Sequence, residues 1–191
     1  MKIALASDHA GFELKQFIKG LLANLKHEME DFGTHSTESV DFVDHVYPAA
    51  LAVAEGRAQR AILIDGAGYP SGIVGNLIPG VFAAVCNDPV SARFAREHSD
   101  TNVLCMGGKV IGALLAQQIV ETWLSAEFLG GKYARRVNKV KELAERHKRP
   151  LSEKARTVIT VQDIKDCLAR KQSLLIDSKT IITPSVKDLL P

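Results

Sequence analysis

Short apolar runs alternate with amphipathic helical segments through most of the chain, and this alternation limits the possible folds more than any other feature. The apolar residues of the helical segments recur every three or four positions, as on one face of a helix. A chain that alternates in this way buries its strands between two layers of helices. We therefore predict a Rossmann-like, doubly wound α/β fold, with a five-stranded parallel sheet in a three-layer αβα arrangement. The predicted strands are residues 2–6, 29–32, 60–64, 81–86 and 103–106.

The pattern changes after residue 149, where Arg149-Pro150-Leu-Ser-Glu-Lys is typical of a linker. We predict one domain over 1–149 and a C-terminal extension over 150–191. Within the extension, 157–161 is expected to form a short strand and 162–169 a short helix. A segment of this size buries too little apolar surface to be stable alone, so we expect it to dock on another surface.

Basic residues are concentrated near the end of the predicted domain. Lys132 to Arg156 holds ten Lys or Arg against three Glu, a net charge of +7 in a chain whose formal charge is +2. Such a run could bind nucleic acid, or it could be a solvated helix face with a few residues turned toward a phosphate. Neither a pattern of interleaved aromatic residues nor a nucleic-acid motif supports the first possibility. We favour the solvated helix and predict no nucleic-acid partner.

The composition also bears on location. No apolar run approaches the roughly 20 residues that span a bilayer, and the first residues lack the long apolar stretch of a signal peptide. The three cysteines, Cys86, Cys105 and Cys167, are odd in number and have no metal-binding spacing. We expect free thiols in a reducing cytoplasm, no membrane association and no metal.

A carboxylate followed by a glycine-rich loop is the clearest candidate site. Asp65 ends a predicted buried strand, and glycines follow at 66, 68, 72 and 75. Glycines let backbone N–H groups approach an anion, and a helix beginning near Ser71 would add its positive end. Alternatively, Asp65 is a cap and the glycines only make a turn. The dinucleotide pattern G-x-G-x-x-G is absent, so no nicotinamide cofactor is expected.

Two further clusters carry groups that exchange protons or bind anions. Asp8-His9 follows the first predicted strand, where it could bind sugar hydroxyls and a phosphate oxygen or could cap the next helix. His98-Ser99-Asp100-Thr101-Asn102 stands directly before a strand. His98 could exchange a proton with a sugar ring oxygen near neutral pH, or could favour the dipole of a helix C-terminus. We expect all three clusters at the ligand-binding edge of the sheet, after strands one, three and five.

In this order and at these separations, the clusters resemble the family of type B ribose-5-phosphate isomerases and galactose-6-phosphate isomerase subunits. The resemblance spans about 1–147 and implies interconversion of an aldose phosphate and a ketose phosphate, first of all ribose 5-phosphate and ribulose 5-phosphate. It also implies a homodimer or dimer of dimers with interfacial active sites, and no metal or other cofactor. The residues that carry it are Ile3-Ala-Leu-Ala-Ser-Asp8-His9-Ala-Gly11-Phe12, Asp31-Phe-Gly33-Thr34, Ala50 to Ala54, Gly66-Ala-Gly68, Asn76, Pro79-Gly80, Ser91-Ala92, His98, Asp100 to Leu104, Gly112 and Gly130-Gly131.

The resemblance also implies a role for each matching residue. His98 would open the sugar ring, Asp8 would bind a hydroxyl, and His9 would bind the phosphate. Arg136 matches a phosphate-binding arginine, while Lys132 and Lys109 stand where arginines are usual and keep the charge without the bidentate fork. Ser99 replaces an asparagine that helps to bind the developing oxyanion. The anion hole for that oxygen would be the loop backbone at Gly66, Ala67, Gly68, Ser71 and Gly72.

The chain departs from the family at the base that moves the proton. Many members have a cysteine at the position of Asp65, and others use a glutamate at the position of Ser71. An aspartate is intrinsically less basic than a thiolate, with a reference pKa of about 3.9 against about 8.5, but it is almost wholly ionised at neutral pH. We hypothesise that Asp65 is the catalytic base. The alternatives are a catalytically silent sugar-phosphate-binding or scaffold protein, and an isomerase for a different sugar phosphate.

The C-terminal extension resembles a short module of several proteins associated with bacterial microcompartments. The similar residues are Val158 to Ile164 and Ile181-Ile-Thr-Pro-Ser-Val-Lys-Asp-Leu189. The resemblance implies docking to a microcompartment shell or core protein, and therefore a cytoplasmic protein inside such a compartment. An extension that packs on its own dimer is the alternative.

Overall fold

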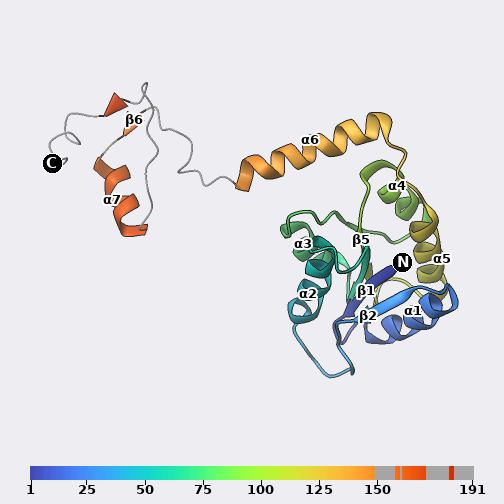
Figure 1. Ribbon diagram of the computed structural model, residues 1–191. Helices are drawn as coiled ribbons and strands as arrows, with labels where there is room; N and C mark the ends of the chain where they lie inside the picture. Colours follow the sequence, from blue (N-terminus) through green and yellow to red (C-terminus); the bar gives the residue numbers. More distant parts are fainter. Residues whose placement is uncertain (149–157, 160, 171–180, 183–191) are drawn as a thin grey trace. The chain divides into compact units, whose positions relative to one another are not determined.

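The computed structural model describes residues 1–148, 158–159, 161–170 and 181–182 (Figure 1). The chain divides into two compact units, Met1–Asn138 and Lys139–Pro191. The first carries a five-stranded sheet and the second a two-stranded sheet. None of the helices in the described part of the chain is long and apolar enough to cross a bilayer.

The first unit is the predicted parallel α/β fold. The strands run in the order β2-β1-β3-β5-β4, and every neighbouring pair is parallel. The predicted fold class is therefore confirmed. The elements are β1 Lys2–Ser7, α1 Phe12–Asn24, β2 Glu28–Asp31, α2 Phe42–Ala54, β3 Arg60–Asp65, α3 Tyr69–Leu77, β4 Ala83–Val85, α4 Pro89–Ser99, β5 Val103–Gly107 and α5 Ala113–Ser125. Helix α6, Gly131–Lys148, begins in this unit and continues into the second.

Two helical layers cover the sheet, because alternate side chains of each strand point to opposite faces. On β1, Ile3 and Leu5 pack with α1, α4 and α5, whereas Ala4 and Ala6 pack with α2 and the residues after α3. Figure 1 shows α2 and α3 together on one side of the sheet and α1 and α5 on the other. The central strands are buried on both faces, which explains their continuous apolar sequences.

The strand order places a topological switch point between β1 and β3. From β1 the chain moves outward to β2, and after α2 it returns to β3 on the other side of β1. The loops that leave β1 and β3 therefore diverge at the carboxyl edge of the sheet. Ligands bind in such a crevice in open α/β sheets.

A buried ion cluster closes the end of β2 near this edge. Lys15 of α1 is 0% exposed, and its Nζ donates to Asp31 Oδ1 and to the Thr34 carbonyl oxygen, both at 2.6 Å. Lys19 Nζ donates to Asp31 Oδ2 at 2.7 Å, and the Gly33 N–H to Oδ1 at 3.0 Å. Burial acts to raise the pKa of Asp31, but these hydrogen bonds outweigh it and bring the pKa to about 2.

In the second unit, β6 Val158–Ile159 pairs in parallel with β7 Ile181–Ile182, and α7 spans Val161–Arg170. These elements agree with the strand predicted at 157–161 and the helix predicted at 162–169. The predicted linker lies outside the described residues, and so do residues 160 and 183–189 of the two segments that resemble a microcompartment module.

Candidate active site

The loops that leave β1, β3 and β5 are joined at the carboxyl edge of the sheet by backbone hydrogen bonds. The Asp8 N–H donates to the Ile64 carbonyl oxygen at 3.1 Å, and the Gly108 N–H donates to that of Asp65 at 2.7 Å. The Lys109 N–H donates to the Gly66 carbonyl oxygen at 3.0 Å. The first two predicted clusters and Lys109 therefore occupy one edge, next to the switch point.

Two glycines allow these loops to lie so close together. Gly68 has a φ of +84°, and a Cβ built on it would lie 2.9 Å from the carbonyl carbon of Met106. A Cβ on Gly108 would lie 2.8 Å from the carbonyl oxygen of Ala10. Larger residues would push the loops apart, so these glycines set the geometry of the site as well as permitting turns.

Asp65 is surrounded by donors from its own loop. Its Oδ1 accepts hydrogen bonds from the N–H groups of Ala67 at 2.8 Å and Gly68 at 2.6 Å. Its Oδ2 accepts from the Ser71 N–H at 2.9 Å and also from the Ser71 hydroxyl. The side chain is 2% exposed and lies at the N-terminus of α3, where the helix dipole favours a negative charge.

These contacts give Asp65 a structural role that the sequence alone left as an alternative. A carboxylate has about four lone-pair directions, and four donors occupy them. Three of those donors are amides of the predicted anion hole. Asp65 therefore fills the cradle that was expected to hold the enediolate oxygen, and it can accept a proton from carbon only after a donor moves away.

Asp8 and His9 lie at the adjacent loop after β1. Asp8 Oδ1 accepts from the Gly11 N–H at 2.9 Å, so Asp8 holds the turn that leads into α1. His9 Nδ1 accepts from the Val40 N–H at 3.2 Å. A neutral imidazole whose Nδ1 accepts a hydrogen bond carries its proton on Nε2, which suits donation to an anionic oxygen.

His98 lies at the opposite edge of the sheet. It is next to the last residue of α4, and the chain then leads into Val103, the first residue of β5. Asp65, by contrast, pairs with Gly107, the last residue of β5. The expectation that all three clusters share one edge is therefore wrong within a single chain. The direction of the chain is the reason, because a cluster directly before a parallel strand lies at the amino edge.

Two basic residues at the start of α6 lie near His98. The Leu129 N–H donates to the Glu97 carbonyl oxygen at 3.1 Å, which fixes the segment before α6 against the end of α4. The imidazole of His98 stacks on Tyr133, with ring centroids 4.2 Å apart. Lys132 and Arg136 flank Tyr133, with their cationic groups 5.1 and 5.7 Å from its ring centroid. His98, Ser99, Lys132 and Arg136 thus form a second group of candidate residues.

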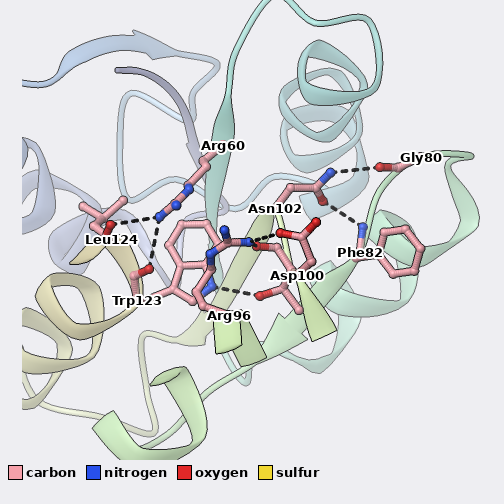
Figure 2. A network of polar contacts seen from close by, with 9 residues as sticks. Arg60, Gly80, Phe82, Arg96, Asp100, Asn102, Trp123 and Leu124 are labelled. Carbon is pink, nitrogen blue, oxygen red and sulfur yellow. Dashed lines mark hydrogen bonds and ion pairs between the residues drawn. The ribbon is translucent and has the colours of Figure 1, made fainter. Parts of the chain in front are cut away.

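A polar network holds the connection between α4 and β5 (Figure 2). Arg96 donates to Asp100 Oδ1 at 3.0 Å and to the Thr101 carbonyl oxygen, while Asp100 adopts a left-handed conformation with a φ of 50°. Asn102 accepts from the Phe82 N–H and donates to the Gly80 carbonyl oxygen, both at 2.8 Å. The network fixes the residues that directly follow His98 and Ser99.

Arg60 belongs to the same part of the structure. Its guanidinium donates to the carbonyl oxygens of Trp123 and Leu124 at 3.1 Å, at the end of α5 (Figure 2). Burial, with a contribution from the neighbouring Arg96, lowers the pKa of Arg60 to about 10. No sequence motif pointed to Arg60 or Tyr133, because Arg60 binds the end of α5 and Tyr133 stacks on a residue of α4. Arg96 was not singled out either, although its partners Asp100 and Thr101 follow it closely in the sequence.

Comparison with known proteins identifies the family. A family model described as Ribose/Galactose Isomerase matches residues 3–140. The chain belongs to this isomerase family. The resemblance predicted from the sequence, to sugar-phosphate isomerases of this type, is thereby confirmed.

Relatives of the Ribose/Galactose Isomerase family differ in the sugar for which they are named. Ribose-5-phosphate isomerase B of Escherichia coli is 41% identical over 76% of this chain and 97% of its own length. D-erythrulose-4-phosphate isomerase of Pectobacterium atrosepticum is 37% identical over 73% and 93%. The structure of Clostridium thermocellum ribose-5-phosphate isomerase B covers 77% of this chain and 99% of that chain, with a TM-score of 0.76 and 46% identity.

Among the residues that the structure describes, no three His, Cys, Asp or Glu side chains gather closely enough to hold a metal ion. The groups available at the carboxyl edge are carboxylates, an imidazole, a lysine and backbone amides. These groups can bind an anion and move a proton.

Proposed function

We propose that the protein is an aldose–ketose isomerase that acts on a phosphorylated sugar, with ribose 5-phosphate and ribulose 5-phosphate as the first pair to test. The observation that supports this best is the loop after β3, where a buried carboxylate and several amides converge at the switch point of the sheet. An isomerisation of this kind moves one proton between C1 and C2 and places negative charge on one oxygen. A proton-accepting group and an anion cradle meet those two needs.

In the proposed mechanism, the sugar oxygen competes with Asp65 for the loop amides. As the carbonyl oxygen takes the amides of Ala67 and Gly68, Asp65 Oδ1 loses its two donors and becomes free to accept the proton. Oδ2 remains held by Ser71, whose hydroxyl can rotate without a backbone change. Asp8 would bind a hydroxyl, and His9 Nε2–H and Lys109 would bind anionic oxygens of the substrate.

A specific observation favours a second candidate function. Because all four acceptor positions of Asp65 are occupied, the protein could bind a sugar phosphate without isomerising it. Incubation with ribose 5-phosphate in deuterium oxide separates the two functions. An isomerase produces ribulose 5-phosphate and introduces deuterium at the carbon that exchanges its proton. Saturable binding with neither product nor deuterium uptake would establish the silent binding protein instead.

We propose that two copies of the chain complete each active site, in a homodimer or a dimer of dimers. The two groups of candidate residues lie at opposite edges of one sheet, so a single chain does not bring Asp65 and His98 together. The outer face of α3 supports an interface beside the Asp65 loop. Tyr69, Ile73 and Leu77 recur every four residues on α3 and are 58%, 65% and 76% exposed.

Mixed dimers should therefore recover activity from two inactive variants. We expect Asp65→Asn and His98→Asn to be strongly impaired when each is purified alone. A heterodimer of the two contains one site with both wild-type residues, because each chain contributes a different edge. Co-expression with two affinity tags, followed by purification through both, isolates this species for a turnover assay. If the tagged heterodimer is as inactive as its parents, the two residues do not act in a shared interfacial site.

We propose that residues 150–191 attach this cytoplasmic isomerase to a bacterial-microcompartment shell or core protein. Ile164 and Leu168 lie four residues apart on α7, and Leu168 is 74% exposed, which gives this short helix an apolar side. A fluorescent protein fused to 150–191 should co-localise with co-expressed shells, whereas the chain lacking 150–191 should keep its turnover number. Faster dissociation of the truncated dimer on dilution would instead show that the extension packs on its own dimer.

A further inference from the structure

The imidazole of His98 is enclosed between two aromatic rings. On one face it stacks on Phe94, four residues earlier in α4, with centroids 4.7 Å apart and an interplanar angle of 13°. On the other it stacks on Tyr133 of α6, at 4.2 Å and 6°. The three rings are thus nearly parallel, in a column that joins two helices far apart in the sequence.

Cations flank both ends of this column. The guanidinium carbon of Arg93 lies 5.2 Å from the centroid of Phe94. Lys132 Nζ and the guanidinium carbon of Arg136 lie 5.1 and 5.7 Å from the centroid of Tyr133. Tyr133 therefore stacks on His98 and also lies close to Lys132 and Arg136, two candidate phosphate-binding residues.

This packing restricts what the imidazole can do. Rotation about χ1 or χ2 would carry the ring into Phe94 or Tyr133, so the imidazole is confined to one plane. Both faces are covered, and only the ring edge, which bears the two nitrogen atoms, remains for a substrate. A proton donor held in one plane is suited to a single direction of transfer.

We propose that Phe94 and Tyr133 are positioning residues that hold the His98 imidazole edge-on to the ring oxygen of a cyclic sugar phosphate. This role rests on the proposed isomerase function. In the step that it serves, the C1–O4 bond of the furanose breaks, O4 gains a proton from His98, and the C1 hydroxyl loses its proton to become the aldehyde. The sugar undergoes no net oxidation, and His98 recovers its proton by way of the one released from O1.

The ketose substrate separates ring opening from the later proton transfer. Ribulose 5-phosphate cannot form a furanose, because its O5 is esterified, so it enters the site as an open chain. Exchange of its C1 proton with solvent deuterium therefore requires the base but not His98. Net conversion of ribose 5-phosphate requires both. A defect confined to His98 therefore lowers the rate of conversion of ribose 5-phosphate and leaves the rate of deuterium exchange into ribulose 5-phosphate unchanged.

Tyr133→Leu is the informative variant and Tyr133→Phe is its matched control. We expect Tyr133→Leu to lower the conversion of ribose 5-phosphate about tenfold, the rate equivalent of one lost ring stack. Deuterium exchange into ribulose 5-phosphate should stay within about twofold of wild type, because the base is untouched. Tyr133→Phe keeps the stacking face and should match wild type in both assays. Phe94→Leu, which uncovers the other face of His98, should repeat the selective loss.

Lys132→Gln tests the competing explanation that Tyr133 acts through the phosphate site. Both sugars carry a 5-phosphate, so damage to that site raises KM for both. Equal losses of conversion and exchange in Tyr133→Leu would overturn the positioning role. A wild-type protein that neither converts nor exchanges these sugars would instead overturn the proposed function on which this role rests.

A spectroscopic measurement tests the column without a substrate. The chain has 6 histidines including His98. The ring currents of Phe94 and Tyr133 should move the carbon-bound proton resonances of His98 upfield of those of the other histidines. Tyr133→Phe should keep that shift, and both Tyr133→Leu and Phe94→Leu should reduce it. A His98 resonance at an ordinary position in the wild-type protein would show that the column does not form in solution.

Discussion

Replacing Asp65 with asparagine should lower the turnover number by about 10² or more, while the affinity for the sugar phosphate changes only a few-fold. The proposed base would then be missing, since an amide does not accept a proton from carbon. The phosphate and hydroxyl contacts at His9, Lys109 and Asp8 come from other loops and should persist. Steady-state kinetics and calorimetric titration with ribose 5-phosphate measure the two quantities.

Asparagine has a second effect that a control must remove. Its NH2 group would face the N–H and hydroxyl of Ser71, or the N–H groups of Ala67 and Gly68, in place of an acceptor oxygen. The loop could therefore rearrange even if Asp65 were only structural. Loss of activity in Asp65→Asn alone does not distinguish a base from a cap of α3.

Asp65→Cys makes that distinction. A cysteine accepts hydrogen bonds weakly, so it should not restore the loop contacts, but it supplies a base with a reference pKa of about 8.5. If position 65 carries the base, this variant should be clearly more active than Asp65→Asn, and its activity should rise with pH toward the thiol pKa. If both variants are equally inactive at every pH, Asp65 organises the loop and the base lies elsewhere.

Local patterns were sufficient to predict the fold of the first unit. The runs around Ile62 and Val103 are continuously apolar because both faces of these strands are buried. Such strands can therefore be predicted from the sequence alone. Helix starts carried their own signals. Asp88 accepts from the Ser91 N–H at 2.8 Å and Pro89 occupies the first position of α4, and both residue types favour these positions at the start of a helix.

The relative positions of the site residues were harder to predict. The residue types of the cluster at His98 suit a ligand site, but they do not indicate at which end of a strand the cluster lies. Its position before β5 places it at the amino edge of the sheet, not at the expected carboxyl edge. The hydrogen bonds of Asp65 depend on the backbone path of the glycine loop, and the residue types in the loop do not predict that path. The stacking of Tyr133 on His98 joins α6 to α4, and only the assembled fold brings these helices together.

We expect the largest loss of stability from a substitution in the ion cluster of Lys15 and Asp31. Replacing Asp31 with alanine leaves a lysine that is 0% exposed without its carboxylate, and we expect the free energy of unfolding to fall by about 3–5 kcal/mol. Lys15→Met is the matched control, because an unbranched apolar side chain can fill the same space. Asp31 then still has Lys19 and the Gly33 N–H, so this variant should lose much less.

The same cluster determines how the free energy of unfolding changes as the pH falls. The pKa of Asp31 is lowered from 3.8 to about 2 in the folded protein, so its stabilising contribution is complete above the unfolded-state pKa and is lost as the pH falls toward 2. Asp31→Ala should remove that part of the acid dependence. Trp123, the single tryptophan, is fully buried in the first unit, so its fluorescence can follow denaturant unfolding at fixed protein concentration between neutral and acidic pH. Parallel stability curves for Asp31→Ala and wild type below pH 3.8 would show that Asp31 is not held by these lysines in solution.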